Sequence, residues 1–155
     1  MRLKSNFYLT ILIAGLVFLV EFFLKNYLRN FLLQSFKVFD KILYITVIPN
    51  TGAAFGVLKD NANLLIYVGI LFLLFFFRFV FKEKNKNLLF LISSGLIIGG
   101  ALSNIYDRVF YGYVLDYIDL RFWPVFNLAD SCISIGVILL LFDSFRKKNE
   151  AGNNS

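Results

Sequence analysis

The sequence predicts an all-α integral membrane protein with four transmembrane helices and a small extracytoplasmic β-rich region. Hydrophobic residues make up 59% of its 155 residues, and the mean hydropathy of +0.72 is far above that of a soluble domain. The apolar residues gather into four long runs. Two of the connections between these runs are rich in β-branched and aromatic residues, which are typical of strands.

Each apolar run is close to the length that a helix needs to cross about 30 Å of hydrocarbon. The fourth run reaches that length only if Asp130 is counted inside it. The sequence has 2 Pro, 10 Gly and no visible repeat, which indicates one domain at residues 1–148 and a disordered cytoplasmic tail at 149–155. The predicted spans are residues 7–23, 64–80, 88–105 and 128–145.

The distribution of charge predicts the orientation of the four spans. Both termini fall on one side of the membrane, and that side carries nine basic and three acidic residues, whereas the other side carries seven of each. The positive-inside rule therefore predicts cytoplasmic termini. No small-residue cleavage site follows the first run, so we expect a retained span and not a cleaved signal peptide. The basic residues are split into short clusters, which argues against a nucleic-acid partner. Those of the terminal side are Arg2, Lys4, Arg78, Lys82, Lys84, Lys86, Arg146, Lys147 and Lys148.

Polar residues within the spans collect at the outer ends of the helices. A transporter is expected to place some of them near the membrane midplane, where its substrate passes. The midplane stretches of this chain are instead built of Leu, Ile, Phe and Gly. The polar residues of the outer ends are Glu21 and Lys25 in the first span, Asn104, Asp107 and Arg108 in the third, and Asp130 in the fourth.

Two outer loops are expected to rest at the membrane surface. The first, residues 26–63, holds a strand-like segment at 38–48 and then the small-residue segment 49–56, which suits a tight backbone excursion. The second loop, residues 109–125, is also strand-like and carries aromatic rings that prefer the headgroup region. These rings are Tyr111, Tyr113, Tyr117, Phe122 and Trp123.

Two aspartates, Asp116 and Asp130, are the candidates for chemistry. Two carboxylates held close together away from bulk water cannot both ionise cheaply, so one keeps a proton while the other acts as a base on a water molecule. The chain has no His and a single Cys, Cys132, so neither a zinc site, a Ser-His-Asp triad nor a cysteine nucleophile is expected. The competing interpretation of Asp130 is a helix N-cap. The nearby Asp119 is expected to be a solvated loop residue.

Four segments, in order along the chain, together resemble the lipoprotein signal peptidases, also called type II signal peptidases. They are Asn50-Thr-Gly-Ala-Ala-Phe-Gly56, Gly100-Ala-Leu-Ser-Asn-Ile-Tyr-Asp-Arg108, Gly112-Tyr-Val-Leu-Asp-Tyr117 and Phe126-Asn-Leu-Ala-Asp-Ser131. Each segment is a weak signal alone, but four of them distributed among four spans form a specific pattern. The resemblance runs from the first span to the end of the fourth.

The resemblance implies an aspartic endopeptidase of the bacterial inner membrane. Its substrates would be prolipoproteins, cleaved immediately before a cysteine that carries diacylglycerol, and its active site would lie at the extracytoplasmic face. Asp116 and Asp130 correspond to the catalytic aspartates, and no metal or cofactor is implied. Membrane lipids are the other expected partners, and we expect a monomer. The expected supporting residues are Asn50, Gly52, Asn104, Asp107, Arg108, Asn127, Glu21 and Lys25.

One segment departs from the family pattern, and two other functions stay open. The family usually has an aspartate followed by a hydroxyl residue and a lysine, whereas this chain has Glu21 and Lys25 at i, i+4 spacing, which allows a pair on one helix face. A rival enzyme would use Ser103 or Ser131 with Lys25, and it predicts that serine substitution abolishes activity. A small transporter or scaffold predicts no proteolysis by the purified protein.

Overall fold

Four long helices and a three-stranded antiparallel sheet make up the computed structural model, which describes residues 2–53, 58–59, 61–84 and 86–152. All four helices are long and apolar enough to cross a membrane, so the predicted fold class is confirmed. The elements are α1 (Arg2–Leu28), the 3-10 helix η1 (Arg29–Phe31), β1 (Ser35–Phe39), β2 (Leu43–Asn50), α2 (Ala62–Lys82), α3 (Leu88–Tyr111), β3 (Val114–Asp119) and α4 (Leu128–Gly152).

The helices extend beyond the predicted apolar runs. The α3 helix continues to Tyr111 and is closed by Gly112, whose φ of 77° is the left-handed conformation that glycine adopts without strain. The α4 helix continues to Gly152 and includes residues 149–152, which we expected in the tail, while residues 153–155 lie outside the described part. A helix does not end where its apolar run ends, because charged side chains that reach water or an ionic partner can continue it.

The α3 helix is the centre of the bundle, and it packs against each of the other three long helices. Two small residues allow the closest approaches. A Cβ at Gly99 would lie 2.6 Å from the carbonyl oxygen of Ala14 in α1, and one at Gly100 would lie 2.5 Å from that of Ala129 in α4. Both distances are shorter than a carbon atom tolerates, so these two positions set how closely the neighbouring backbones pack.

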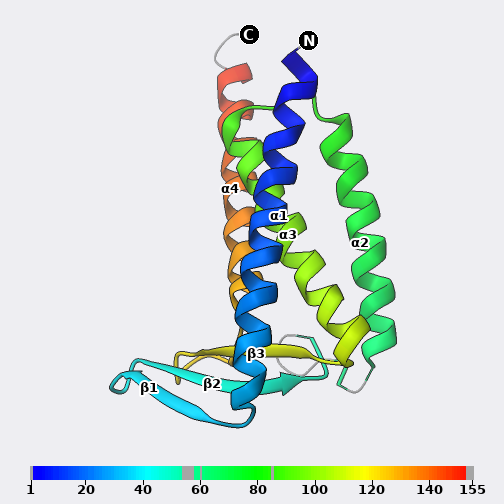
Figure 1. Ribbon diagram of the computed structural model, residues 1–155. Coiled ribbons are helices and arrows are strands. Elements are labelled where there is room, and N and C mark those ends of the chain that lie inside the picture. Colours follow the sequence, from blue (N-terminus) through cyan, green and yellow to red (C-terminus); the bar gives the residue numbers. More distant parts are fainter. Residues whose placement is uncertain (1, 54–57, 60, 85, 153–155) are drawn as a thin grey trace.

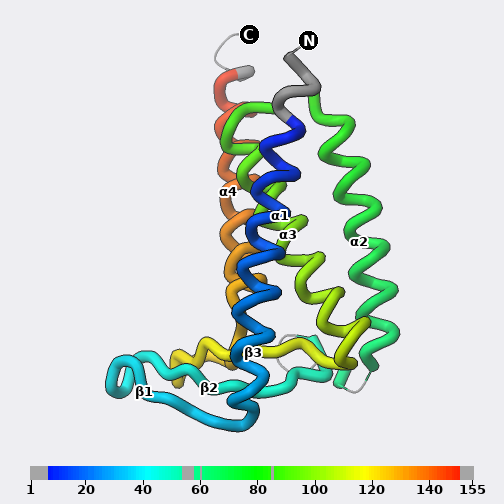
Figure 2. Tube along the Cα trace, viewed as in Figure 1, coloured from blue at the N-terminus to red at the C-terminus, as the bar shows by residue number. Residues whose placement is uncertain are grey.

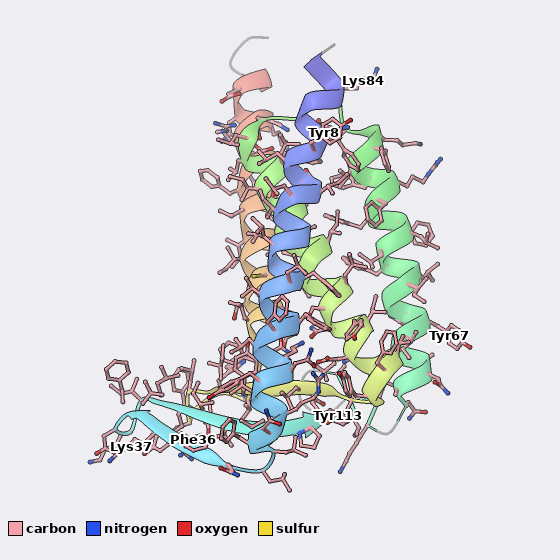
Figure 3. The ribbon with its side chains drawn as sticks, viewed as in Figure 1. Tyr8, Phe36, Lys37, Tyr67, Lys84 and Tyr113 are labelled. Carbon is pink, nitrogen blue, oxygen red and sulfur yellow. The ribbon has the colours of Figure 1, made fainter. Side chains whose placement is uncertain are left out.

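Both chain ends and the α2–α3 connection lie at one end of the bundle, and the sheet lies across the other end (Figures 1 and 2). The outer surfaces of α1, α2 and α4 carry large exposed apolar side chains (Figure 3), such as Phe23 at 67%, Phe75 at 65% and Ile138 at 65% exposure. A soluble protein would not expose so much apolar surface, but a membrane protein presents it to lipid.

The sheet has the order β1-β2-β3, so the first outer loop forms two strands, β1 and β2, around the segment predicted at 38–48. Residue Ile48 of β2 pairs with Asp116 of β3, and Asn50 pairs with Val114. Side chains alternate along β3. Leu115 and Tyr117 belong to an apolar cluster with Leu28 of α1, so Asp116 between them projects from the opposite face of the strand.

This alternation corrects one prediction about the second outer loop. Phe122 and Trp123 are exposed, at 80% and 54%, as expected for rings at a membrane surface, but Tyr117 is only 3% exposed. Its ring belongs to the apolar cluster with Leu28, because Tyr117 lies on the face of β3 opposite to that of Asp116.

A second buried polar cluster lies at the end of the bundle that holds both termini. The sequence predicted only the net charge of this end. Asp143 of α4 is 1% exposed, accepts a hydrogen bond from Asn87, and pairs with Lys147 over 2.8 Å and Arg146 over 3.2 Å. Asn87 also caps α3 by accepting from the backbone N–H of Phe90 over 2.8 Å. This cluster ties the start of α3 to the last turns of α4.

Candidate active site

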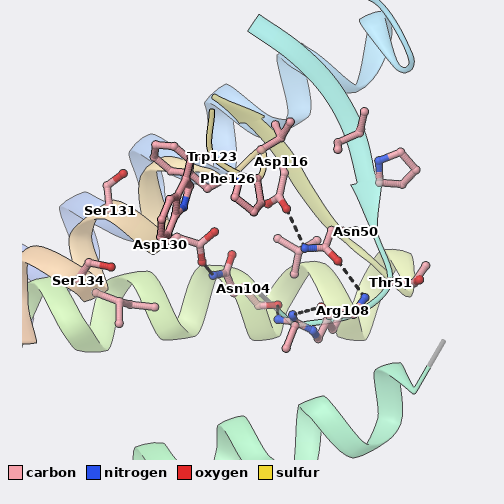
Figure 4. A pocket seen from close by; sticks show the side chains of 18 of the residues that line it. Asn50, Thr51, Asn104, Arg108, Asp116, Trp123, Phe126, Asp130, Ser131 and Ser134 are labelled. Atoms are coloured by element: carbon pink, nitrogen blue, oxygen red, sulfur yellow. Dashed lines mark hydrogen bonds between the residues drawn. The ribbon is translucent and has the colours of Figure 1, made fainter. Parts of the chain in front are cut away.

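A cavity of about 1100 Å³ lies where the sheet meets α3 and the start of α4 (Figure 4). Six of the ten predicted site residues line it, namely Asn50, Gly52, Asn104, Arg108, Asp116 and Asp130. The other four, Glu21, Lys25, Asp107 and Asn127, are buried behind the wall. The structure therefore brings all the predicted residues together, in a layer that faces the cavity and a layer that supports it.

Asp116 enters the cavity from β3 and is 2% exposed. Its Oδ2 accepts a hydrogen bond from Nδ2 of Asn50, and its Oδ1 accepts one from Nδ2 of Asn127, each over 2.8 Å. Burial raises the pKa of Asp116 to about 7, and the charge of Asp130 raises it as well, whereas the two amide donors and Lys25 act to lower it. This carboxyl can therefore carry a proton near neutral pH.

Asp130 enters the cavity from the first turn of α4. Its Oδ2 accepts from the backbone N–H of Asn127 over 3.3 Å, while Oδ1 of Asn127 accepts from the backbone N–H of Asp130 over 2.9 Å. This reciprocal pair is a capping box in which Asn127 is the N-cap, so Asp130 contributes to the cap from the first turn but is not itself the N-cap. The other oxygen of Asp130 accepts from Nδ2 of Asn104 over 2.8 Å and lines the cavity. Asp130 thus has a capping contact and a free approach to the cavity at once.

A buried ion pair supports Asn104 from behind. Nζ of Lys25 lies 3.1 Å from Oδ2 of Asp107, with both side chains at most 2% exposed. The same ammonium donates to Oδ1 of Asn104 over 3.0 Å and to Oγ of Ser103 over 3.2 Å. Its three N–H donors thus have three acceptors, which is what a buried cation requires.

Glu21 does not form the ion pair with Lys25 that their spacing allows. Within the described residues, no ion pair joins the two; Glu21 instead accepts from the backbone N–H of Ala129 and from the hydroxyl of Tyr117, the latter over 3.1 Å. The i, i+4 spacing permits a pair but does not require it, and the stronger tertiary partners of each residue prevail here. Glu21 is 0% exposed.

Asn50, Gly52 and Arg108 shape the rim of the cavity. Oδ1 of Asn50 accepts from the backbone N–H of Gly52 over 2.9 Å, which closes a tight turn after β2. The guanidinium of Arg108 donates to the carbonyl oxygen of Gly52 over 2.9 Å and to that of Asn104 over 3.2 Å. Arg108 therefore holds the rim to α3. The remainder of the small-residue segment, residues 54–57, lies outside the described part.

Asp119 was predicted to be a solvated loop residue, but the structure buries it and gives it a structural role. It is 7% exposed, accepts from Oγ1 of Thr46 over 2.7 Å and accepts from the backbone N–H of Arg121 over 2.9 Å. Burial acts to raise the pKa of Asp119, but these hydrogen bonds and the Arg121 charge lower it below its usual value. Asp119 is the last residue of β3, and its side chain contacts Thr46 of β2 and does not line the cavity.

The part of the chain that the structure describes has no group of three or more His, Cys, Asp or Glu side chains placed to hold a metal ion.

Comparison with known proteins shows the family of the chain. Residues 13–146 match the family model described as signal peptidase (SPase) II. The chain belongs to the signal peptidase II family.

Curated relatives agree with this assignment to the signal peptidase II family. A lipoprotein signal peptidase of Wigglesworthia glossinidia brevipalpis is 38% identical over 154 residues, covering 92% of this chain and 95% of the relative. Another, from Syntrophus aciditrophicus, is 35% identical over 163 residues, covering 96% and 99%. A solved structure described as a bacterial membrane enzyme superposes with a TM-score of 0.85 at 33% identity, covering 91% of this chain and 90% of that one.

Two residues around the candidate site of this signal peptidase II family member were not predicted from the sequence. Arg29 pairs with Asp107, and its guanidinium lies 3.5 Å from the ring centroid of Tyr111. Tyr117 was assigned to the membrane surface, yet its hydroxyl contacts Glu21. Nothing in the sequence indicated that Arg29 would join Lys25 at Asp107, because that contact depends on how α1 and η1 lie against α3. The sequence of β3 likewise did not indicate which of its side chains pack into the apolar cluster.

Proposed function

We propose that this member of the signal peptidase II family is an aspartic endopeptidase that removes signal peptides from prolipoproteins. Cleavage occurs immediately before a cysteine that carries diacylglycerol. The observation that carries the proposal is the arrangement of Asp116 and Asp130, which reach one cavity from two different elements and are held by separate amide donors. The resemblance to lipoprotein signal peptidases supports the choice of substrate.

Asp116 carries the shared proton and Asp130 is the base. Asp116 is the more buried of the two carboxyls, and its raised pKa favours the protonated form. Asp130 lies at the start of α4, where its two carboxyl oxygens accept from the backbone N–H of Asn127 and from Nδ2 of Asn104. The base removes a proton from water as the water oxygen attacks the scissile carbonyl carbon. Asp116 donates its proton to the carbonyl oxygen, which gives a neutral gem-diol. As the C–N bond breaks, Asp130 passes the proton taken from water to the leaving amine nitrogen of the cysteine, and Asp116 takes one hydroxyl proton back from the gem-diol, which leaves a carboxylic acid product and both aspartates in their starting states.

The walls of the cavity suit a substrate with one polar and one lipid part. Asn50, Asp116 and Asp130 are among the polar lining residues, whereas Ile133 and Ile135 of α4 and the ring of Trp123 provide apolar lining. Ile135 is 51% exposed, so this lining continues to the outer surface of the bundle, where acyl chains of a bound substrate remain in the bilayer. The peptide bond meanwhile meets the two aspartates.

The active site faces the extracytoplasmic side in this proposal. Nine of the 16 basic residues and three of the ten acidic residues belong to the opposite end of the bundle, where both termini lie, and the sheet end has seven of each. That arrangement supports cytoplasmic termini by the positive-inside rule. A multi-pass protein of the bacterial inner membrane with this orientation meets a prolipoprotein after its lipid-bearing segment has reached the outer interface.

The serine and lysine alternative has one contact in its favour and two against it. Nζ of Lys25 lies 3.2 Å from Oγ of Ser103. Both side chains are buried outside the cavity, and the lysine is a cation paired with Asp107, so it cannot accept a proton from the serine. Ser131 does line the cavity, but its hydroxyl donates to the carbonyl oxygen of Asn127 over 3.2 Å.

The test uses purified protein with a diacylglyceryl prolipoprotein and with its unlipidated form. We expect cleavage of the lipidated substrate only, complete loss of cleavage in Asp116→Asn and Asp130→Asn, and retained cleavage in Ser103→Ala. Asp119→Asn is the matched control, because Asp119 ends the same strand but does not line the cavity. Equal cleavage of both substrates would overturn the lipid requirement, and full activity of either aspartate variant would overturn the aspartic mechanism.

A further inference from the structure

The first three backbone N–H groups of α4 each donate to a side chain, and the three side chains come from three different parts of the chain. The N–H of Leu128 donates to the hydroxyl of Tyr117 over 3.1 Å. The N–H of Ala129 donates to Oε1 of Glu21. The N–H of Asp130 donates to Oδ1 of Asn127 over 2.9 Å. Helix starts normally leave these donors without an intrahelical partner.

The contacts lie away from water. Glu21, Asn127 and Ala129 are 0% exposed and Tyr117 is 3% exposed. A backbone N–H that loses its partner in such surroundings cannot be satisfied by bulk solvent, so the helix start must shift or absorb the cost. The three side chains therefore define where the first turn of α4 lies.

The Tyr117 hydroxyl connects two of these contacts. It accepts from the N–H of Leu128 and donates to Oε2 of Glu21 over 3.1 Å. One hydroxyl of β3 therefore contacts both the start of α4 and a side chain of α1. Burial raises the pKa of the Tyr117 phenol, which keeps its proton available for donation. A phenylalanine would keep the ring in the apolar cluster and lose both contacts.

Tyr117 also connects the two elements that carry the aspartates. It directly follows Asp116 in β3, and it contacts Leu128, two residues before Asp130 in α4. The hydroxyl therefore joins the strand that carries one aspartate to the helix that carries the other. It does so from the face of β3 opposite the cavity, without lining the cavity itself.

We propose that Tyr117 is a positioning residue for catalysis, which fixes Asp130 relative to Asp116 by anchoring the first turn of α4 together with Glu21. The proposal rests on the two-aspartate function above. A small displacement of a catalytic group lowers turnover without weakening substrate binding to the same degree, because the apolar contacts of the substrate lie elsewhere in the cavity.

Tyr117→Phe is the test variant and Tyr113→Phe is its matched control. Tyr113 lies just before β3, its ring is half-buried, and its hydroxyl makes no hydrogen bond to the residues that the structure describes. With a lipidated prolipoprotein and correction for the folded fraction, we expect kcat of Tyr117→Phe to fall about tenfold or more while KM changes less than about twofold. Tyr113→Phe should keep both constants. An unchanged kcat, or a loss confined to KM, would overturn the proposal.

Two further measurements separate positioning from folding and from the chemistry. Hydrogen exchange of the peptide covering residues 126–134 should become faster in Tyr117→Phe, while exchange in the rest of α4 stays the same. This readout does not depend on catalysis, so it remains informative if the aspartate variants refute the proposed function. In a double-mutant cycle, Tyr117→Phe and Glu21→Gln should reduce kcat less than additively, because both disturb one link. Full additivity, or unchanged exchange at the helix start, would show that Tyr117 is not an anchor.

Discussion

Asn127 donates from Nδ2 to Oδ1 of Asp116 over 2.8 Å, and with its own Oδ1 it accepts from the backbone N–H of Asp130. One buried side chain therefore touches the side chain of the first aspartate and the backbone of the second. Neither contact is available to water, because Asn127 is 0% exposed. The relation makes Asn127 the most direct physical connection between the two carboxyl groups.

Replacing Asn127 by alanine is therefore expected to lower both activity and stability. Loss of the cap should cost about 1 kcal/mol, and displacement of the two aspartates should reduce kcat/KM about 10²-fold. Asn87→Ala is the matched control, since Asn87 caps α3 at the opposite end of the bundle. Thermal unfolding in detergent should detect both losses, whereas peptide cleavage per folded molecule should fall only for Asn127→Ala. A similar loss of specific activity in both variants would contradict the special role of Asn127.

The pH dependence of cleavage should report the titration of Asp116. If Asp116 must be protonated, kcat/KM falls as pH rises through about 7. Asn50→Ala removes a hydrogen bond that acts to lower the pKa of Asp116. The alkaline limb of the pH profile should therefore move to higher pH in this variant. Asn30→Ala should leave the limb in place, because it changes an exposed amide whose one hydrogen bond among the described residues is to the carbonyl oxygen of Tyr27. A shift of the Asn50→Ala limb to lower pH would refute the assigned direction.

The same group predicts how stability depends on pH. The pKa of Asp116 is higher in the folded protein than in the unfolded chain, so the folded state binds more protons and loses stability as pH rises from about 4 to 7. Asp116→Asn lacks this titration. The difference in melting temperature, variant minus unmodified protein, should therefore increase between about pH 5 and pH 7 and become constant above that. A difference that does not vary with pH would mean that burial leaves this carboxyl unperturbed.

Gly100→Ala should disturb the start of α4 from the α3 side. The new Cβ would lie 2.5 Å from the carbonyl oxygen of Ala129 and 2.8 Å from Cγ1 of Ile133, so the two helices must separate. We expect a loss of about 1–3 kcal/mol of stability and a fall in cleavage. Gly15→Ala is the control, because no neighbouring atom of the part of the chain that the structure describes lies within 4 Å of its added Cβ. It should be neutral or stabilising by up to about 1 kcal/mol, as alanine is the better helix former. Equal stability of both variants would contradict the close approach at Gly100.

The sequence predicted the four spans because they depend on local signals, and it singled out Asp116 and Asp130 as candidates for the same reason. Four runs of apolar residues require four membrane-crossing helices, and Asp116 and Asp130 occur in short segments with specific spacing. The sequence did not predict the layer behind the cavity. Lys25 has possible acid partners at i−4 and on another helix, and its choice of Asp107 depends on how α1 and α3 pack. Helix spacing alone carries no information about that packing.

Residues of β3 illustrate the same limit. Asp119 and Tyr117 look like surface residues of a loop, since a charged and an aromatic side chain are both common there. The structure buries both, because β3 is covered by α1 on one face and joined to β2 along its edge. Burial of a short strand follows from its tertiary neighbours, and its six residues contain too few positions to reveal a pattern.

The alternation along β3 also bears on how the protein can change over time. Asp116 projects to the cavity, while Leu115 and Tyr117 project to the apolar cluster beneath the sheet. Inserting or deleting one residue before Asp116 would exchange the two faces, so that a carboxylate entered the cluster and an apolar side chain entered the cavity. A length change in this strand would therefore disturb the packing of the apolar cluster and the lining of the cavity together. The number of residues before Asp116 is thus constrained by both faces of β3 at once.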